Sequence, residues 1–326
     1  MPSLDIVSST YAGELAKPYV AALILSADSV VNRYVTLHEN VKHRLVLKKL
    51  SGDVIQDFAC DFVVPEEANL DLTEIILEPS RLMVNEQFCK EQFRDDWDAM
   101  ATGRGFINDT IPTDFQSFLL LYLASKVQEG VERAIWQGNF NSATSGTTGG
   151  NSVAFFPGLL RQAVIQTALI GNEELVAGAF TPDANGTTGI LTHLDDLVGN
   201  APDTVQNASN SVIYMSKKSL FLLQRAMAGL AVTTGGYSPT FVGDPRPTQF
   251  LGYPIITPSG FANDCLLLTY VENLHFGTDL TSDFNQAVVV DMTQTDASDN
   301  VRVAMRFTGG CAISSPEDVS IVRRTS

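Results

Sequence analysis

Apolar residues recur at steps of three and four between Ile111 and Gly138, and this pattern predicts one long helix. The residues on the apolar stripe are Phe115, Phe118, Leu119, Tyr122, Leu123, Val127, Val131, Ala134 and Ile135. Thr113 and Gln116 suit a capping box at the start, and Gly138 suits the left-handed turn that closes many helices. We therefore expect a spine helix over residues 113–137. Its charged residues are too frequent for a membrane span.

A different pattern, alternation with a period of two, begins at Val41. The even positions of one segment are apolar and two aspartates fall on its other face, which is typical of a half-buried strand: Val54, Phe58, Cys60, Phe62 and Val64 against Asp57 and Asp61. Ser51-Gly52-Asp53 offers a turn, so this strand should pair with residues His43–Leu50. A two-stranded ribbon is marginal alone in water. Its apolar face, with Phe58 and Phe62, is therefore expected to rest on another subunit.

The segments around the ribbon and the spine have weaker patterns. Residues 1–40 are expected to form an arm with a short helix from Ala12 to Lys17, limited by Pro18. Leu70–Leu77 reads as a strand. The segment Glu78–Met100 then predicts a charge-rich helix, with Phe88, Phe93 and Trp97 on it, that packs beside the spine.

The second half of the chain alternates between helices and strands and predicts an α+β lobe. Polar stretches at 139–152 and 181–188 read as loops. The expected helices are His193–Val198 and one that Ser216 caps and that runs through Met227. The expected strands are Val212–Met215, Cys265–Tyr270, Gln286–Asp291 and Asn300–Phe307.

The charge balance narrows the class of partner. Charged residues make up 18% of the 326 residues, against about 25% in typical soluble domains, which suggests that much of the surface meets other protein. With 21 basic and 37 acidic residues the net charge is −16, so a surface that grips phosphates is not expected. Cys60, Cys89, Cys265 and Cys311 show no paired spacing and no signal peptide precedes them. This pattern favours reduced thiols in a cytosol.

Candidate chemistry is sparse. His193 with Asp195 and Asp196 is the best cluster for acid–base or metal work, although His193 and Asp196 at i, i+3 on a helix also make an ordinary surface pair. Cys60, Cys89 and His43 lack the close spacing of a zinc site. The glycine-rich loop at 139–152 lacks the Lys-Ser/Thr pair of a phosphate loop. We therefore expect no catalytic, cofactor-binding or metal-binding residues.

One basic cluster stands out against the acidic background: Lys42, His43, Arg44, Lys48 and Lys49. It could be the solvated face of a strand, or it could bind an acidic neighbour. Because a chain of charge −16 that meets copies of itself needs local pairs to offset repulsion, we favour Arg44, Lys48 and Lys49 as contacts with an adjacent subunit.

The order of these pieces resembles the major capsid proteins of tailed bacteriophages, which have the Hong Kong 97-like fold. The segments that carry the resemblance are an arm, a projecting ribbon, a spine ending in IWQGN, a glycine-rich loop, and a lobe with YMSKKSLFLLQ, FLGYPI and HFGTDL. More narrowly, NVKHRLVLKKL, DFACDF and LEPSRLMVNEQFCKEQFRDDW look like capsid proteins of crAss-like and related phages of Bacteroidetes hosts.

The resemblance implies an α+β capsid fold with four parts. These are an N-terminal arm at 1–40, an extended hairpin loop at 41–72, a peripheral domain at 73–190 and 306–326 built around the spine, and an axial domain at 191–305. The arm is too short to contain the scaffolding domain that many members carry, so a separate scaffolding protein is expected. Lys–Asn cross-linking is not carried over, because neither the Asn partner nor the acidic catalyst can be matched.

The implied function is structural. The chain would assemble in the host bacterial cytoplasm into pentamers and hexamers of an icosahedral virion shell. The shell would enclose double-stranded DNA without reading its sequence. A portal would be a partner, decoration proteins stay an open option, and no membrane is expected. One alternative is an encapsulin, a cellular compartment of the same fold that encloses cargo proteins. The other is a soluble hydrolase that uses His193 and Asp196.

Overall fold

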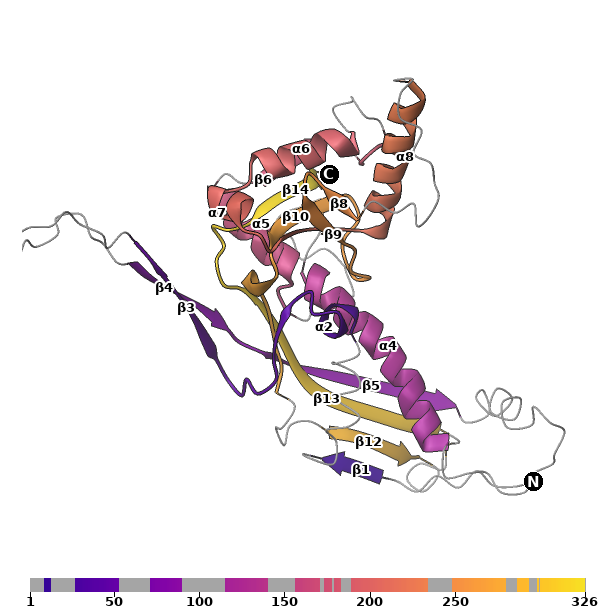
Figure 1. Ribbon diagram of the computed structural model, residues 1–326. Coiled ribbons are helices and arrows are strands. Elements are labelled where there is room, and N and C mark those ends of the chain that lie inside the picture. Colours follow the sequence, from indigo (N-terminus) through magenta and orange to yellow (C-terminus); the bar gives the residue numbers. More distant parts are fainter. Residues whose placement is uncertain are drawn as a thin grey trace, which may run out of the picture.

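The computed structural model describes residues 9–12, 27–52, 71–89, 115–139, 156–170, 173–177, 179–182, 189–233, 248–279, 286–292, 298 and 300–325. Within them the chain forms two six-stranded sheets and one two-stranded ribbon. Figure 1 shows the long helix α4 (Phe115–Gln137) lying along one sheet, helices α6 (Ile190–Gly199) and α8 (Lys217–Thr233) beside the other, and the ribbon extending away from both.

The first sheet is built around β13 (Asn300–Ile313), a strand of 14 residues. β13 pairs antiparallel with β12 (Gln286–Asp291), with β11 (Leu274–Gly277) and, over ten residue pairs, with β5 (Ser80–Cys89). The N-terminal strand β1 (Ser9–Ala12) extends the sheet beyond β12, and β2 (Thr36–His38) pairs in parallel with β11. Segments from both ends of the chain therefore meet in this sheet.

The second sheet has the order β6 (Glu173–Ala177), β14 (Ser320–Thr325), β10 (Cys265–Tyr270), β7 (Ser211–Met215), β9 (Tyr253–Ile256) and β8 (Gln249–Phe250). Its central strands are buried on both faces. Tyr214 and Leu267 point into one core with α4, while Ile213 and Leu268 point into a second core with α6 and α8. This double burial explains why the two strands read as continuous apolar runs and not as alternating ones.

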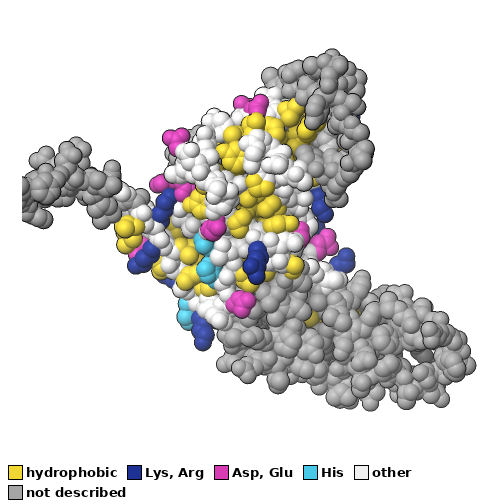
Figure 2. Space-filling model, in the orientation of Figure 1, with side chains coloured by type: hydrophobic (Ala, Val, Ile, Leu, Met, Phe, Trp, Pro, Cys, Tyr) yellow, Lys and Arg dark blue, Asp and Glu magenta, His cyan; other side chains and the backbone are white. Residues whose placement is uncertain are grey.

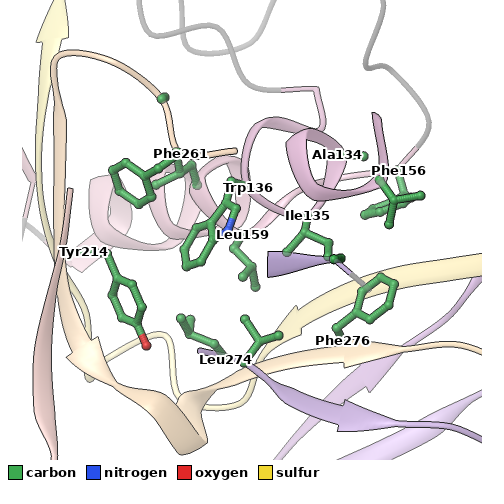
Figure 3. Packing of buried hydrophobic residues seen from close by; sticks show 14 of the residues in the cluster. Ala134, Ile135, Trp136, Phe156, Leu159, Tyr214, Phe261, Leu274 and Phe276 are labelled. Atoms are coloured by element: carbon green, nitrogen blue, oxygen red, sulfur yellow. The ribbon is translucent and has the colours of Figure 1, made fainter. Parts of the chain in front are cut away.

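The spine helix is the centre of the larger core. Figure 3 shows Trp136 directed toward Tyr214 and Phe261, and ring centroids separate it from them by 5.2 and 5.1 Å. Leu123, Val131, Ala134 and Ile135 are buried and Val127 is half-buried against the same core, which confirms the predicted stripe where the structure describes its side chains. Thr113 and its capping box lie outside the described residues.

The spine helix ends where the sequence predicted, but Gly138 is needed there for a different reason. Asn139, not Gly138, has the left-handed backbone, with φ of 53°. Gly138 is required for space, because a Cβ placed on it would lie 2.2 Å from the carbonyl oxygen of Phe156. The chain returns here so closely that the Gly158 amide donates to the Gly138 carbonyl at 2.8 Å. α5 (Leu159–Ile170) begins directly after this contact.

Three local predictions were wrong. Residues Ser80–Cys89 form strand β5 instead of a helix, because Leu82, Val84 and Phe88 alternate toward the core and the segment pairs with β13. Ala12 ends strand β1 and does not begin a helix; residues 13–17 lie outside the described part. The ribbon strand β3 (Leu45–Ser51) pairs with β4 (Asp71–Leu77), so the turn expected at Ser51-Gly52-Asp53 does not close the hairpin.

Most elements of the second half are confirmed. The expected segments correspond to α6, β7, α8, β10, β12 and β13, and the Ser216 hydroxyl accepts a hydrogen bond from the Ser219 amide at 3.1 Å, as a capping residue should. Three described α-helices were not expected: α2 (Asp28–Val31), α5, and α7 (Asp203–Asn207), which follows α6.

Candidate functional site

The described part of the ribbon has two unlike faces. In the β3–β4 register, Val46 lies opposite Ile76 and Leu50 opposite Leu72. These four apolar side chains belong to residues that are between 42% and 63% exposed. The other face, with Leu45, Leu47 and Ile75, packs on the small cluster of Val41, Leu77 and Ala312. The described residues therefore leave one face of the ribbon, with these four apolar side chains, exposed.

Lys48 sits in the middle of that exposed face. Its ammonium lies 3.0 Å from Glu74, the residue directly opposite it on β4. Arg44, just before β3, similarly lies 3.4 Å from Glu78. Both pairs are solvent-exposed, where ion pairs contribute about 0–1 kcal/mol. Figure 2 shows hydrophobic and Lys/Arg side chains side by side where the ribbon leaves the body.

Lys49 points to the opposite face and ties the ribbon to the body. Its ammonium donates to Asp318 Oδ2 at 2.7 Å. Asp318 is only 5% exposed and also accepts hydrogen bonds from Thr204 and Tyr270. Burial alone would raise the pKa of Asp318, but the hydrogen bonds from Lys49, Thr204 and Tyr270 outweigh it and lower this pKa below its ordinary value.

The structure thus gives each of the three basic candidates a carboxylate partner in its own chain. Arg44 and Lys48 keep exposed side chains, and a contact with a neighbouring subunit stays a prediction for them. The same contact for Lys49 would compete with Asp318. Phe58 and Phe62, the apolar candidates, lie outside the described residues.

A second cluster lies between β6 and α6, with His193 buried and the two carboxylates half-buried. Glu174 of β6 and His193 and Asp196 of α6 bring one ligand atom each to within 4.8 Å of one another. The sequence suggested His193 and Asp196 but not Glu174, which lies on another element with no local spacing that links it to them. Asp195, the third member of the expected cluster, is exposed.

The electrostatics of this cluster come from burial. His193 is 1% exposed and its ring packs on that of Phe180 at 5.0 Å between centroids. Burial lowers the pKa of His193, and Asp196 partly offsets that effect. The pKa of Glu174 is raised to about 7, mainly by burial and also by the charge of Asp196 and a hydrogen bond with it.

His193 does not suit a hydrolase. A general base must reach the proton that it abstracts, within hydrogen-bond distance of substrate or through one water. The side chain of His193 is enclosed, so the hydrolase alternative has no support from its position.

Two further polar contacts lie within the larger core. Glu132, 3% exposed, accepts from the amide of Ser29 at 3.0 Å and from its hydroxyl at 2.6 Å, which fastens α4 to α2. The other contact joins β2 to β11, where His38 Nε2 lies 3.0 Å from His275 Nδ1. Burial, and to a lesser extent the charge of a protonated His38, lowers the pKa of His275 to about 4.

The remaining candidates bring no chemistry together. Among the residues that the structure describes, the Glu174 cluster is the one group of three potential metal ligands, so Cys89 and His43 join no such group; Cys60 is outside that part. Burial raises the pKa of the thiols of Cys265 and Cys311, which makes them poor nucleophiles.

Across the described helices, none combines the length and the apolar character that crossing a bilayer requires.

An apolar groove of about 260 Å³ runs between the spine and β5. The lining residues from α4 include Leu123 and Val127, and those from β5 include Leu82 and Val84. Its walls offer few polar groups that could orient a small molecule, unlike typical ligand sites.

Comparison with known proteins gives a match in structure only. No family model matches the sequence, and no curated protein matches it. A chain of the satellite phage P4 procapsid, which includes the size determination (Sid) protein, superimposes with a TM-score of 0.60 at 12% identity, over 99% of this chain and 94% of that one. A chain from the capsid of a native GTA particle gives 0.54 at 12% identity, over 92% and 91%. A chain of Microbacterium phage Oxtober96 gives 0.53 at 12% identity, over 99% and 95%. The chain therefore has an α+β capsid-protein fold, consistent with the Hong Kong 97-like fold that the sequence resemblance implied.

Proposed function

We propose that this chain is the major capsid protein of a tailed phage, a structural subunit that assembles into the pentamers and hexamers of an icosahedral head. The observation that carries this proposal is the fold match to capsid structures over nearly the whole of both chains. Shell building requires each subunit to present surface to its neighbours, and the low content of charged residues, 18%, agrees with that need.

The ribbon is the element best suited to contact a neighbour. Its exposed face carries Val46, Leu50, Leu72 and Ile76 on two strands that project from the body. Exposed apolar side chains gathered on one face, here on both sides of the Lys48–Glu74 pair, are typical of interaction sites, and the strands pair only with one another within the described residues. We assign the ribbon to the extended loop, proposed at 41–72, and expect it to lie across the adjacent subunit.

The other domains follow the same scheme as proposals. Residues 1–40 would form the arm, 73–190 with 306–326 the peripheral domain around the spine, and 191–305 the axial domain near the capsomer centre. Assembly in the host cytoplasm would use a separate scaffolding protein and a portal, with decoration proteins possible. The segment resemblance suggests membership of the crAss-like and related phage group.

The shell would contain DNA without gripping it. A net charge of −16 repels phosphates on average, so enclosure does not require a binding surface on this chain. An encapsulin of the same fold would enclose proteins instead. The nucleic-acid content of purified particles separates these two functions.

The test is expression of the full chain, followed by sizing with light scattering and negative-stain electron microscopy. We expect capsomers of five or six copies, or closed shells, with or without added scaffolding protein. A chain that stays monomeric at millimolar concentration and at every salt concentration would contradict the proposal. A variant in which a Gly/Ser linker replaces Ile55–Phe62 should still fold but should lose shell formation.

A further inference from the structure

Three side chains that the capsid role leaves unexplained converge between β6 and α6. His193 and Asp196 are three residues apart on α6, which puts them on one face of the helix. Glu174 reaches the same point from β6, the edge strand of the second sheet. Their potential ligand atoms all lie within 4.8 Å of one another.

The cluster has buried polar atoms that lack hydrogen-bond partners. Both ring nitrogens of His193 and one carboxylate oxygen of Glu174 have none. Buried polar groups in native proteins are almost always satisfied, so an unpartnered imidazole that is 99% buried needs an explanation. The Nδ1 atom of His193 faces Glu174 Oε1 at 3.5 Å, which is long for a hydrogen bond.

The same separation suits two ligands of one metal ion. With metal–ligand bonds of about 2.0–2.2 Å and tetrahedral geometry, neighbouring ligand atoms lie about 3.3–3.6 Å apart. One imidazole nitrogen with two carboxylates matches Zn²⁺ or Mn²⁺ better than Mg²⁺, which avoids imidazole, or copper(I), which prefers sulfur. We propose that Glu174, His193 and Asp196 form a structural binding site for a divalent transition-metal ion of the Zn²⁺ or Mn²⁺ class.

The surroundings fit this role. The ring of Phe180 packs against the imidazole and fixes its plane. The side chain of Glu174 is 27% exposed, against 2% for His193, so an ion can enter from the side of Glu174. Bound metal would clamp the edge strand β6 to α6, two elements that both contribute to the second core, through Val176 and Leu194 respectively.

The experiment uses the full chain, stripped with EDTA and then titrated with ZnCl₂ or MnCl₂. Bound metal per chain is measured by elemental analysis after gel filtration, and the melting temperature is followed in parallel. Co²⁺ serves as a spectroscopic probe, because its visible absorption reports ligand number and geometry. We expect one equivalent per chain, a rise in melting temperature, and a Co²⁺ spectrum of a nitrogen–oxygen site.

Matched variants assign the ligands. Glu174→Gln and Asp196→Asn keep the shape of each side chain and should weaken binding at least tenfold, whereas Asp195→Asn, one position away and exposed, should bind as the unchanged chain does. Wild-type protein that takes up no metal at millimolar Zn²⁺ or Mn²⁺ overturns the proposal, as does equal binding by all three variants. If Glu174→Gln and Asp196→Asn fail to fold, the Co²⁺ spectrum of the Asp195→Asn protein still tests the proposal. A spectrum that does not fit a nitrogen–oxygen site would overturn it. Metal uptake is measured per chain, so it can fail or succeed whether or not shells form.

Discussion

At the scale of single residues, Glu132 shows how the core accommodates a buried carboxyl group on the spine helix. Its oxygens accept from Ser29 and from the Trp136 indole, which lies 3.2 Å from Oε1. Burial raises the pKa of Glu132, and these hydrogen bonds oppose the rise. Glu132→Gln replaces one acceptor oxygen by a donor that faces another donor, which should cost about 1–3 kcal/mol. Glu129→Gln, an exposed change one turn away, should cost under about 1 kcal/mol. Equal urea midpoints for the two variants would contradict this role.

His275 should make stability depend on pH. The folded protein favours the neutral ring, because its pKa falls from 6.5 to about 4 on folding. Its contribution is therefore complete above pH 6.5 and is lost as the pH falls toward 4, by up to about 1.4 kcal/mol per pH unit. His275→Asn should flatten this part of the profile of unfolding free energy against pH, and His43→Gln, at an exposed position, should not. A wild-type slope retained in His275→Asn would rule out the assignment.

Two glycines of the spine should respond in opposite directions to the same change. Gly138→Ala places a methyl group 2.2 Å from a backbone oxygen, so we expect a loss of several kcal/mol or failure to fold. Gly130→Ala meets nothing within 4 Å and should stabilise the helix by about 0.5–1 kcal/mol. Thermal melting of both proteins tests this. A tolerated alanine at 138 would show that the return at Gly158 can move aside.

At the scale of elements, the ribbon is held to the body by Lys49. Lys49→Met leaves the buried Asp318 carboxylate with its bonds from Thr204 and Tyr270 but without a cation. The expected cost is about 1–3 kcal/mol. Lys48→Met, on the exposed face, should cost no more than about 1 kcal/mol. Denaturation of the two variants side by side gives the comparison, and a larger effect at Lys48 would reverse our assignment of the faces.

Some elements could be predicted from the sequence because local and tertiary signals agree in them. The spine has helical period and apolar content together, and β7 and β10 are apolar runs that match burial on both faces. The prediction for β5 was wrong because the charged residues of this segment suggested a helix. Its pairing with β13 depends on residues more than 200 positions away. The same holds for Glu174, whose place beside His193 is set by sheet topology.

At the scale of the whole molecule, Lys48 is the residue with which to test contact between subunits. Lys48→Glu puts two like charges face to face with Glu74 in the middle of the exposed ribbon face. It should slow or block assembly while leaving the free subunit folded. Salt at 1 M, where screening shortens to about 3 Å, should relieve most of the defect.

The control for this variant is Lys217→Glu, which makes the same change in net charge at an exposed position at the start of α8. It should assemble normally. Normal assembly of Lys48→Glu at low salt would remove the ribbon face from the interface, and a defect that salt leaves unchanged would indicate steric damage.

The length of β13 has a mechanical consequence. β13 forms ten register pairs with β5 and six with β12, and its C-terminal end pairs with β11. A force applied along this strand loads its hydrogen bonds in shear, all together, whereas a force across the sheet would unzip them one after another. We therefore expect the subunit to be stiffer along the axis of β13 than across it. A shell under internal pressure would resist stretching best where that axis lies in the plane of its wall.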